Sequence, residues 1–221
     1  MAKRLLIYAA GVLLLGFGIV LNTKAGLGVG SVTTLSYAVS EMTPLTLGTV
    51  TTLMYFGFVA AQLAIYRKFS VKVLLQLPFS YLMGHIIDFY DNLLDFTVDS
   101  LGLGLGLLAA AIVCTALAAY VVVAMDLIPN PADGMARAVG YAVHMEFGRG
   151  KLIFDCVMVA VTAVVSLVFA HRIIGIGLGT VLSALCIGRL IQSFGRSLGP
   201  YMDAVLAESR RRDREAKKLA A

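Results

Sequence analysis

The chain has 221 residues, of which 59% are hydrophobic and 14% are charged, and its mean hydropathy is +0.89. A soluble domain carries closer to about 25% charged residues, so the composition excludes an ordinary soluble domain. The net charge of +5 does not indicate nucleic-acid binding, because the Lys and Arg residues flank apolar runs or lie in the tail. Three cysteines lie inside apolar runs, with neither metal-site nor disulfide spacing.

Six apolar runs predict six transmembrane helices. They lie at about 5–22, 45–66, 72–91, 101–125, 152–170 and 173–194. The first run also resembles a signal peptide, but no small-x-small cleavage site closes it cleanly, so we interpret it as a retained first span. Pro78 predicts a kink in the third span.

Two shorter segments with polar stripes interrupt these spans, 25–41 after the first and 129–146 after the fourth. Three glycines in the first segment and two prolines in the second oppose a continuous helix. Irregular backbone survives at membrane depth only where it is buried in protein or lines a wet cavity. We therefore predict two short broken helices, with Ser31 and Asp133 as their N-caps.

The positions of Lys and Arg predict the orientation of the spans. With the N-terminus in the cytoplasm, almost all basic residues fall on the cytoplasmic side, whereas Lys24, Arg172 and the acidic loop 88–99 fall outside. A rival topology has eight full spans, in which both short segments cross. It places Arg67 and Lys68 outside and the acidic loop inside, so the charge rule favours six spans.

The polar segment occurs twice, because a shift of 104 positions superimposes the two parts of the chain. Residues that coincide include Gly30 and Gly134, Tyr37 and Tyr141, Met54 and Met158, and Gly84 and Gly188. Each half then holds three spans, an odd number, so the second half is inverted relative to the first. Inverted repeats recur in transporters, with the site near the membrane midplane at the repeat interface.

The predicted fold class is therefore an all-α polytopic membrane protein. It has six transmembrane helices plus two short broken or re-entrant helices, arranged as an inverted 3+3 repeat. We expect the first three-span repeat at 1–98, the inverted second repeat at 99–199, and a basic cytoplasmic tail at 200–221.

Polar side chains form a stripe on each short segment. The first stripe holds Thr33, Ser36, Tyr37 and Ser40, and the second holds Asp133, Arg137, Tyr141 and His144. These stripes either line a cavity at the repeat interface or face lipid headgroups, as the polar face of an interfacial helix does. Both alternatives stay open at this stage.

Two charged residues lie inside predicted spans, where a charge costs roughly 2.5–3.5 kcal/mol on insertion scales and is a functional candidate. Asp155 either serves the site or pairs with Lys151 one helical turn away. Arg189 either faces a cavity or extends to the interface. The predicted substrate-binding residues are Ser31, Thr33, Tyr37, Asp133, Arg137, Tyr141, Asp155 and Arg189.

The second half, "PNPADGMARAVGYAV" followed by "IGIGLGTVLSALCIGRLIQ", resembles the YczE/YyaS/YitT group of bacterial integral membrane proteins. Asp133-Gly134 matches the turn that begins the short helix in that group, and residues 177–188 match its closing span. The first repeat departs from the pattern, because "GLGVGSV" lacks the usual Trp-Asp. The resemblance implies a bacterial inner-membrane protein related to transport, with no established substrate.

The leading hypothesis is a small secondary transporter or permease for a small polar or anionic solute. The alternative is an accessory or regulatory membrane protein that acts through a protein partner. We expect neither an enzyme nor a bound metal or cofactor, because no Walker A motif, H-E-x-x-H motif or nucleophile elbow occurs. The expected partners are the lipid bilayer and an unidentified small solute, and the chain is also compatible with a homo-oligomer.

Overall fold

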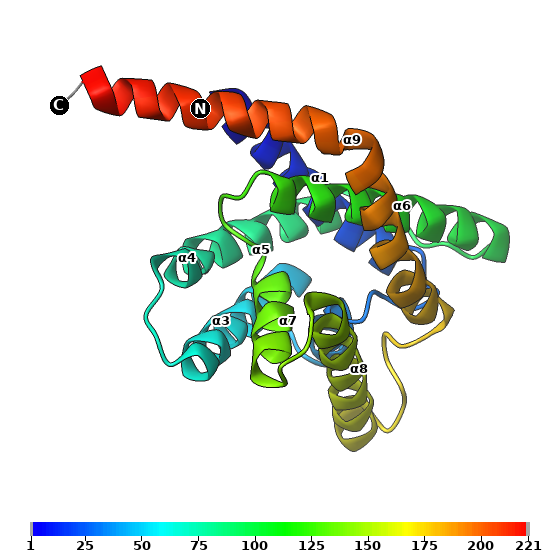
Figure 1. The fold of residues 1–221 in the computed structure, drawn as a ribbon. Helices are drawn as coiled ribbons and strands as arrows, with labels where there is room; N and C mark the ends of the chain where they lie inside the picture. Colours follow the sequence, from blue (N-terminus) through cyan, green and yellow to red (C-terminus); the bar gives the residue numbers. More distant parts are fainter. Residues whose placement is uncertain (1, 220–221) are drawn as a thin grey trace.

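A computed structural model describes the backbone of residues 2–219 and the side chains of residues 2–212. The described residues form helices and no strands (Figure 1). The helices are α1 (Ala2–Lys24), α2 (Thr33–Met42), α3 (Leu47–Tyr66), α4 (Val71–Leu74), α5 (Gln76–Leu93), α6 (Leu101–Ala124), α7 (Pro131–Ala142), α8 (Phe147–Ala170) and α9 (Leu178–Leu219).

Five helices in the described part of the chain are long and apolar enough to cross a membrane: α1, α3, α6, α8 and the 178–212 portion of α9. The all-helical, polytopic membrane class predicted from the sequence is therefore confirmed at this level. The third predicted span forms α4 and α5, separated at Leu75. With 18 residues and several polar side chains, α5 falls outside this set. Pro78 lies in the first turn of α5, where proline is tolerated.

The two short polar segments form α2 and α7, as predicted, but their N-caps differ from the prediction. Asn130 caps α7, because its side chain accepts a hydrogen bond from the Ala132 N–H at 3.2 Å, and Asp133 lies in the first turn. Ser31 precedes α2 without capping it, since no side chain accepts a hydrogen bond at that N-terminus. Because Pro131 occupies the first helical position, α7 begins two residues before Asp133.

The long helices pack into two groups that mix the two ends of the chain (Figure 1). In the scaffold group, α1 lies along α6, while α5 packs on α1 and α9 packs on α6. In the bundle group, α7 packs on α3 and α8, and α2 packs on the same two helices. The bundle group fills the lower half of Figure 1, and α5 joins the groups by packing closely on α3.

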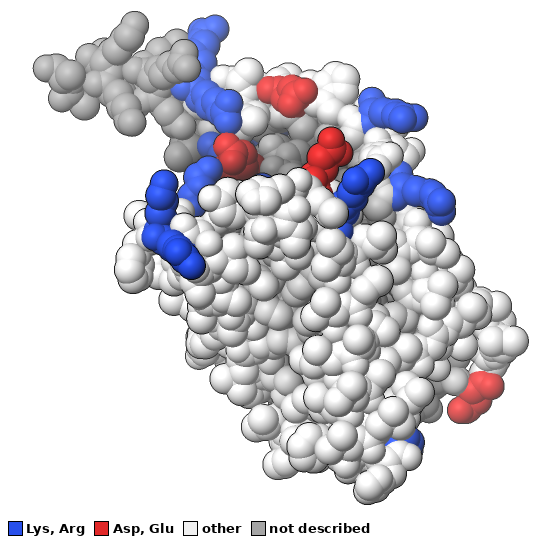
Figure 2. All heavy atoms as spheres, turned by 60° about the horizontal axis from the view of Figure 1, so that its bottom comes forward, with Lys and Arg blue, Asp and Glu red and all other residues white. Residues whose placement is uncertain are grey.

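The apolar core lies between the groups. Val20, Met83 and Ile87 from the scaffold group are fully buried in one cluster with Ala136 and Phe154 from the bundle group. Figure 2 shows charged side chains gathered at one end of the molecule, beside a broad surface that carries none. A wide uncharged surface of this kind fits contact with hydrocarbon rather than water.

The last helix continues from its apolar part into the basic tail. Pro200 lies inside α9, where it removes a backbone hydrogen bond, and Figure 1 shows the helix changing direction before its last turns. Met202 and Val205 beyond the proline are buried in the core cluster. The Lys3 ammonium lies 5.0 Å from the centre of the Tyr201 ring, so the described part of the tail packs on the start of α1.

Candidate functional site

A cavity of about 480 Å³ opens where the two groups of helices meet near the acidic loop 88–99. We call this end of the molecule the acidic end. Its lining comes from the ends of α1 and α5, the loops that follow them, α2, and the start of α3 with the loop before it. The lining residues are Thr23, Lys24, Gly26, Tyr37, Ser40, Glu41, Leu45, Thr46, Leu47, Asp91, Phe96, Thr97 and Val98.

The charged groups of this cavity come from both groups of helices. On the scaffold side, the Lys24 ammonium lies 2.9 Å from the Asp91 carboxylate. On the bundle side, the Tyr37 hydroxyl shares a hydrogen bond with the Glu41 carboxylate one turn later. Two carboxylates and one ammonium give the lining a net negative charge. Such a cavity can bind a polar group by hydrogen bonds and an amine by charge.

Directly beside the cavity, the Asp88 carboxylate of α5 holds the first turn of α3. One oxygen accepts a hydrogen bond from the Gly48 N–H at 2.8 Å, and the other accepts from the Thr46 hydroxyl at 2.8 Å. A carboxylate at a helix N-terminus is stabilised by the free N–H groups and the helix dipole. Asp88 therefore links the scaffold group to the bundle group at the acidic end.

A second cluster of charges lies inside the bundle group, between α7 and α8. The buried Asp155 carboxylate lies 3.4 Å from the Lys151 ammonium, and both groups interact electrostatically with half-buried Asp133. The Arg137 guanidinium also acts on Asp133. A proton on either carboxylate would remove the repulsion between the two.

Uncharged polar groups fix α7 against α3. Gln62 of α3 and Gln76 of α5 donate to each other through their amides, at 2.9 and 3.2 Å, and both side chains are buried. The Gln62 amide also donates to the Pro131 carbonyl at 3.3 Å. A side chain at position 134 would displace this pair, because a Cβ there would lie 2.5 Å from the side-chain amide oxygen of Gln62. The Gln pair therefore positions the first turn of α7.

The loop before α7 is held by cations from three helices, at what we call the basic end. The Arg4 guanidinium donates to the carbonyls of Met125 and Asp126, each at 2.8 Å. The Asp126 carboxylate lies 3.4 Å from the Lys72 ammonium and 3.0 Å from the Arg210 guanidinium. Although partial burial raises the pKa of Asp126, these two cations hold it below its ordinary value of 3.8.

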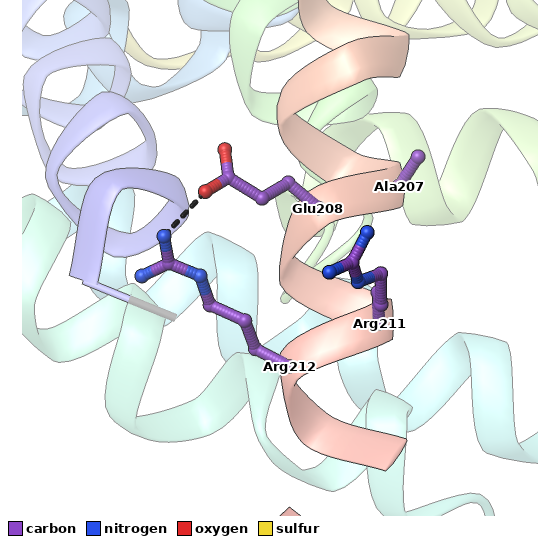
Figure 3. Close-up of a pocket in the computed structure, with 4 residues that line it drawn as sticks. All are labelled: Ala207, Glu208, Arg211 and Arg212. Carbon is purple, nitrogen blue, oxygen red and sulfur yellow. Dashed lines mark hydrogen bonds and ion pairs between the residues drawn. The ribbon is translucent and has the colours of Figure 1, made fainter. Parts of the chain in front are cut away.

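Another hollow, of about 520 Å³, lies beside the tail part of α9 (Figure 3). Its lining residues are Ala207, Glu208, Arg211 and Arg212, with an ion pair between Glu208 and Arg212 on the same helix face. Because the lining residues that the structure describes all come from one exposed helix, this hollow is a poorer candidate site than the cavity at the acidic end. No group of three His, Cys, Asp or Glu side chains in residues 2–212 is placed to hold a metal ion.

A family model described as a family of unknown function (DUF6198) matches residues 2–196. The chain belongs to this family. The match includes all of α1–α8 and α9 as far as residue 196, so both the acidic-end cavity and the charged cluster lie within it. No curated protein and no solved structure matches the chain.

The eight residues predicted to bind a substrate do not converge on one place. Tyr37 lines the acidic-end cavity, and Asp133 and Asp155 belong to the charged cluster with Lys151. The pairing of Asp155 with Lys151, which the sequence left open, is present in the structure. Buried Ser31 and half-buried Thr33 lie at the start of α2 and do not line the cavity.

The remaining three predicted residues lie on exposed faces. The Arg137 guanidinium lies 5.4 Å from the centre of the Phe147 ring, and the Tyr141 ring lies 5.4 Å from that of Tyr66. Arg189 is exposed and donates at 3.4 Å to the carbonyl of Leu185 on its own helix. Neither arginine lines the acidic-end cavity.

Several residues of these sites carried signals that the sequence interpretation did not use. Lys24 is one of the few basic residues predicted to lie outside the membrane. A cation there, on the same side as the acidic loop, predicts an ion pair. Gln62 and Gln76 are amides within apolar runs, where an unpaired amide is costly, so each needs a partner. Glu41 follows Tyr37 by one helical turn, which extends the first polar stripe to the cavity.

Proposed function

We propose that the protein is a small secondary transporter or permease for a small polar solute, which enters at the acidic-end cavity. The observation that carries this proposal is the position of the cavity. It lies between the bundle and scaffold groups, so a movement of one group against the other changes its shape. The lining of two carboxylates and one ammonium favours a zwitterionic or amine-bearing solute over an anion.

The backbone supports the proposed inverted repeat. α3 and α8 both end in a residue of left-handed conformation, Arg67 at φ 51° and His171 at φ 54°, and these residues lie 104 positions apart (67 and 171). The packing is also reciprocal: α7 of the second half packs on α3, and α2 of the first half packs on α8. α5 would then be the sixth span, related to the membrane part of α9.

In this proposal the moving parts are the bundle and scaffold groups, each of which draws helices from both repeats. The Asp133–Lys151–Asp155 cluster would carry a coupling proton or cation, since its two carboxylates interact with each other and with the nearby cations Lys151 and Arg137. The charge distribution and the resemblance to the YczE/YyaS/YitT group support a bacterial inner membrane, with the acidic end outside and both termini cytoplasmic.

Cysteine accessibility in intact cells tests the proposal. The background has Cys114, Cys156 and Cys186 replaced by serine, and single cysteines are placed at Ser40 in the cavity and at Asp133. We expect an impermeant maleimide to label Ser40→Cys from outside and Asp133→Cys from inside. Both labelling rates should change when a protonophore collapses the proton gradient. Val164→Cys, exposed and apolar on α8, is the lipid-facing control and should stay unlabelled.

Unchanged labelling rates at both positions with and without the gradient would contradict transport by moving groups. Failure of Ser40→Cys to label from outside would remove the acidic-end cavity from the solute path.

A second candidate function is an accessory membrane protein, and one observation favours it. Large apolar side chains of α8, such as Leu152 and Val157, are exposed, and so is Leu185 of α9. An apolar face of this extent can bind another protein within the membrane. Cross-linking to a distinct protein through this face, with no gradient-dependent labelling, would favour the accessory function.

A further inference from the structure

The two long-helix pairs related by the proposed repeat pack differently. α5 packs closely on α3, whereas α9 makes no comparable contact with α8 among the described residues. In the first pair, a Cβ on Gly84 would lie 2.0 Å from the Thr52 hydroxyl oxygen. The two helices are therefore too close at this point for a residue with a side chain. Its repeat counterpart, Gly188 of α9, has no atom within 4 Å of its Cβ position.

The same contrast extends one turn along both pairs. The Thr52 hydroxyl lies 3.3 Å from the Ser80 carbonyl, and Ser80 is fully buried. The shift of 104 relates these residues to Cys156 and Ala184 (52 to 156, 80 to 184), and both counterparts are exposed. α9 nevertheless lies on α6 as α5 lies on α1, so only the contact between the groups is missing.

We propose that the protein has a second conformation in which α8 closes on α9 through Gly188, while α3 separates from α5 at the acidic end. This inference rests on the inverted repeat in the proposed function. Symmetry-related halves can exchange conformations at little cost, because each half already contains the helix faces for both arrangements. The Asp88 hydrogen bonds to Gly48 and Thr46 form the latch that favours the conformation described here.

The consequence for the cavity follows from its lining. Leu47 begins α3, Leu45 and Thr46 directly precede it, and Asp91 comes from α5, so separation of these helices widens the cavity toward the acidic end. Closure of α8 on α9 simultaneously covers the apolar face near the basic end. The two contacts therefore act as alternating gates, of which one is closed in each conformation.

Cross-linking the full-length protein in membranes tests this proposal. Cys114 and Cys186 are replaced by serine, native Cys156 is kept, and Ala184→Cys is added. We expect copper-phenanthroline to form an intrachain Cys156–Cys bond, detected by mass spectrometry and by loss of both reactive thiols. The pair Thr52→Cys with Ser80→Cys, in the background without native cysteines, is the positive control because these residues already touch.

Two further variants test whether the Asp88 hydrogen bonds oppose the α8–α9 contact and whether that contact forms at Gly188. Asp88→Ala removes the latch and should raise α8–α9 cross-linking several-fold, whereas Asp95→Ala in the exposed loop after α5 should leave it unchanged. Gly188→Leu faces open space and so should fold normally, yet it should abolish α8–α9 cross-linking. Gly106→Leu, equally open on α6, is its matched control.

Absence of an intrachain bond in every variant, with the positive control formed, would overturn the second conformation. Cross-linking only between two chains would also overturn it and would identify the α8–α9 face as a dimer contact. Neither result bears on whether Ser40→Cys is accessible from outside, so the proposed function is judged separately.

Discussion

The two short helices occupy equivalent places in the chain but are held by different forces. The loop before α2 is held by backbone: the Val29 N–H donates to the Gly175 carbonyl at 2.8 Å, and the Gly179 N–H donates to the Leu27 carbonyl at 2.7 Å. The loop before α7 is held by the cations Arg4, Lys72 and Arg210. Close backbone contacts require glycine but do not depend on charge. The side-chain contacts before α7 are ion pairs and charged hydrogen bonds, so their strength depends on salt and pH.

The same difference explains where the polar stripes lie. α2 turns Tyr37 and Ser40 toward the acidic-end cavity, whereas α7 half-buries Asp133 near Asp155 of α8 and exposes Arg137 and Tyr141. One helix therefore lines a cavity and the other contributes to a charged cluster. The two stripes therefore differ in their surroundings, although the sequence alone treats them as equivalent.

The largest expected effect is at the backbone contact beside α2. Gly28 has φ 95°, and a Cβ there would lie 2.5 Å from the Gly177 nitrogen. Gly28→Ala therefore adds backbone strain and a clash, and should lower the free energy of unfolding by roughly 2–4 kcal/mol. Thermal unfolding in detergent, followed by cysteine exposure, measures it. Gly30→Ala, with no atom near its Cβ position, is the control, and equal losses would contradict the contact.

A smaller effect is expected at the amide pair that positions α7. Gln62→Leu leaves the Gln76 amide unpaired in an apolar interior, and should lower the free energy of unfolding by about 1–3 kcal/mol. The double variant with Gln76→Leu should lose less than the two single variants combined, since both amides are then gone. Additive losses would show that the two amides do not act as a pair.

The smallest effect is expected at the charged loop before α7. The pKa of Asp126 is lower in the folded protein than its ordinary value, so its ion pairs stabilise the fold above that value. Their contribution disappears as the pH falls through the folded pKa. Asp126→Asn should cost under about 1 kcal/mol at pH 7, because both partners are half exposed.

The pH and salt dependence of the stability loss in Asp126→Asn tests whether the loops before α2 and α7 are held by different forces. The melting temperature of this variant should approach that of the parent protein below about pH 4 and at high salt. The loss from Gly28→Ala should not depend on salt. A salt-dependent loss at Gly28, or a salt-independent loss at Asp126, would show that the two loops are not held by different forces.

Much of the helical layout could be predicted from the sequence because apolar length and charge position are local signals. The ends of the predicted spans 5–22, 45–66, 101–125 and 152–170 lie within five residues of the ends of α1, α3, α6 and α8. The 104-residue shift relates Arg67 to His171, which share one unusual conformation.

The site was less predictable, because it depends on which helices face each other. Arg137 and Arg189 were candidates as charges in apolar context, but packing placed both on exposed faces. Lys24, Glu41 and Asp91 come from three elements that only the fold brings together. The N-caps were misjudged because Asn130 and Pro131 start α7 earlier than the first acidic residue suggests.

The central claim is that the bundle group moves against the scaffold group, and pulsed electron paramagnetic resonance tests it most directly. One pair of spin labels spans the groups at the acidic end, on Thr43 and Leu93, and another spans them at the basic end, on Gly148 and Gln192. The account predicts two distance populations for each pair. Asp88→Ala should lengthen the first distance and shorten the second. One narrow distance for each pair, unchanged by Asp88→Ala, would contradict the account.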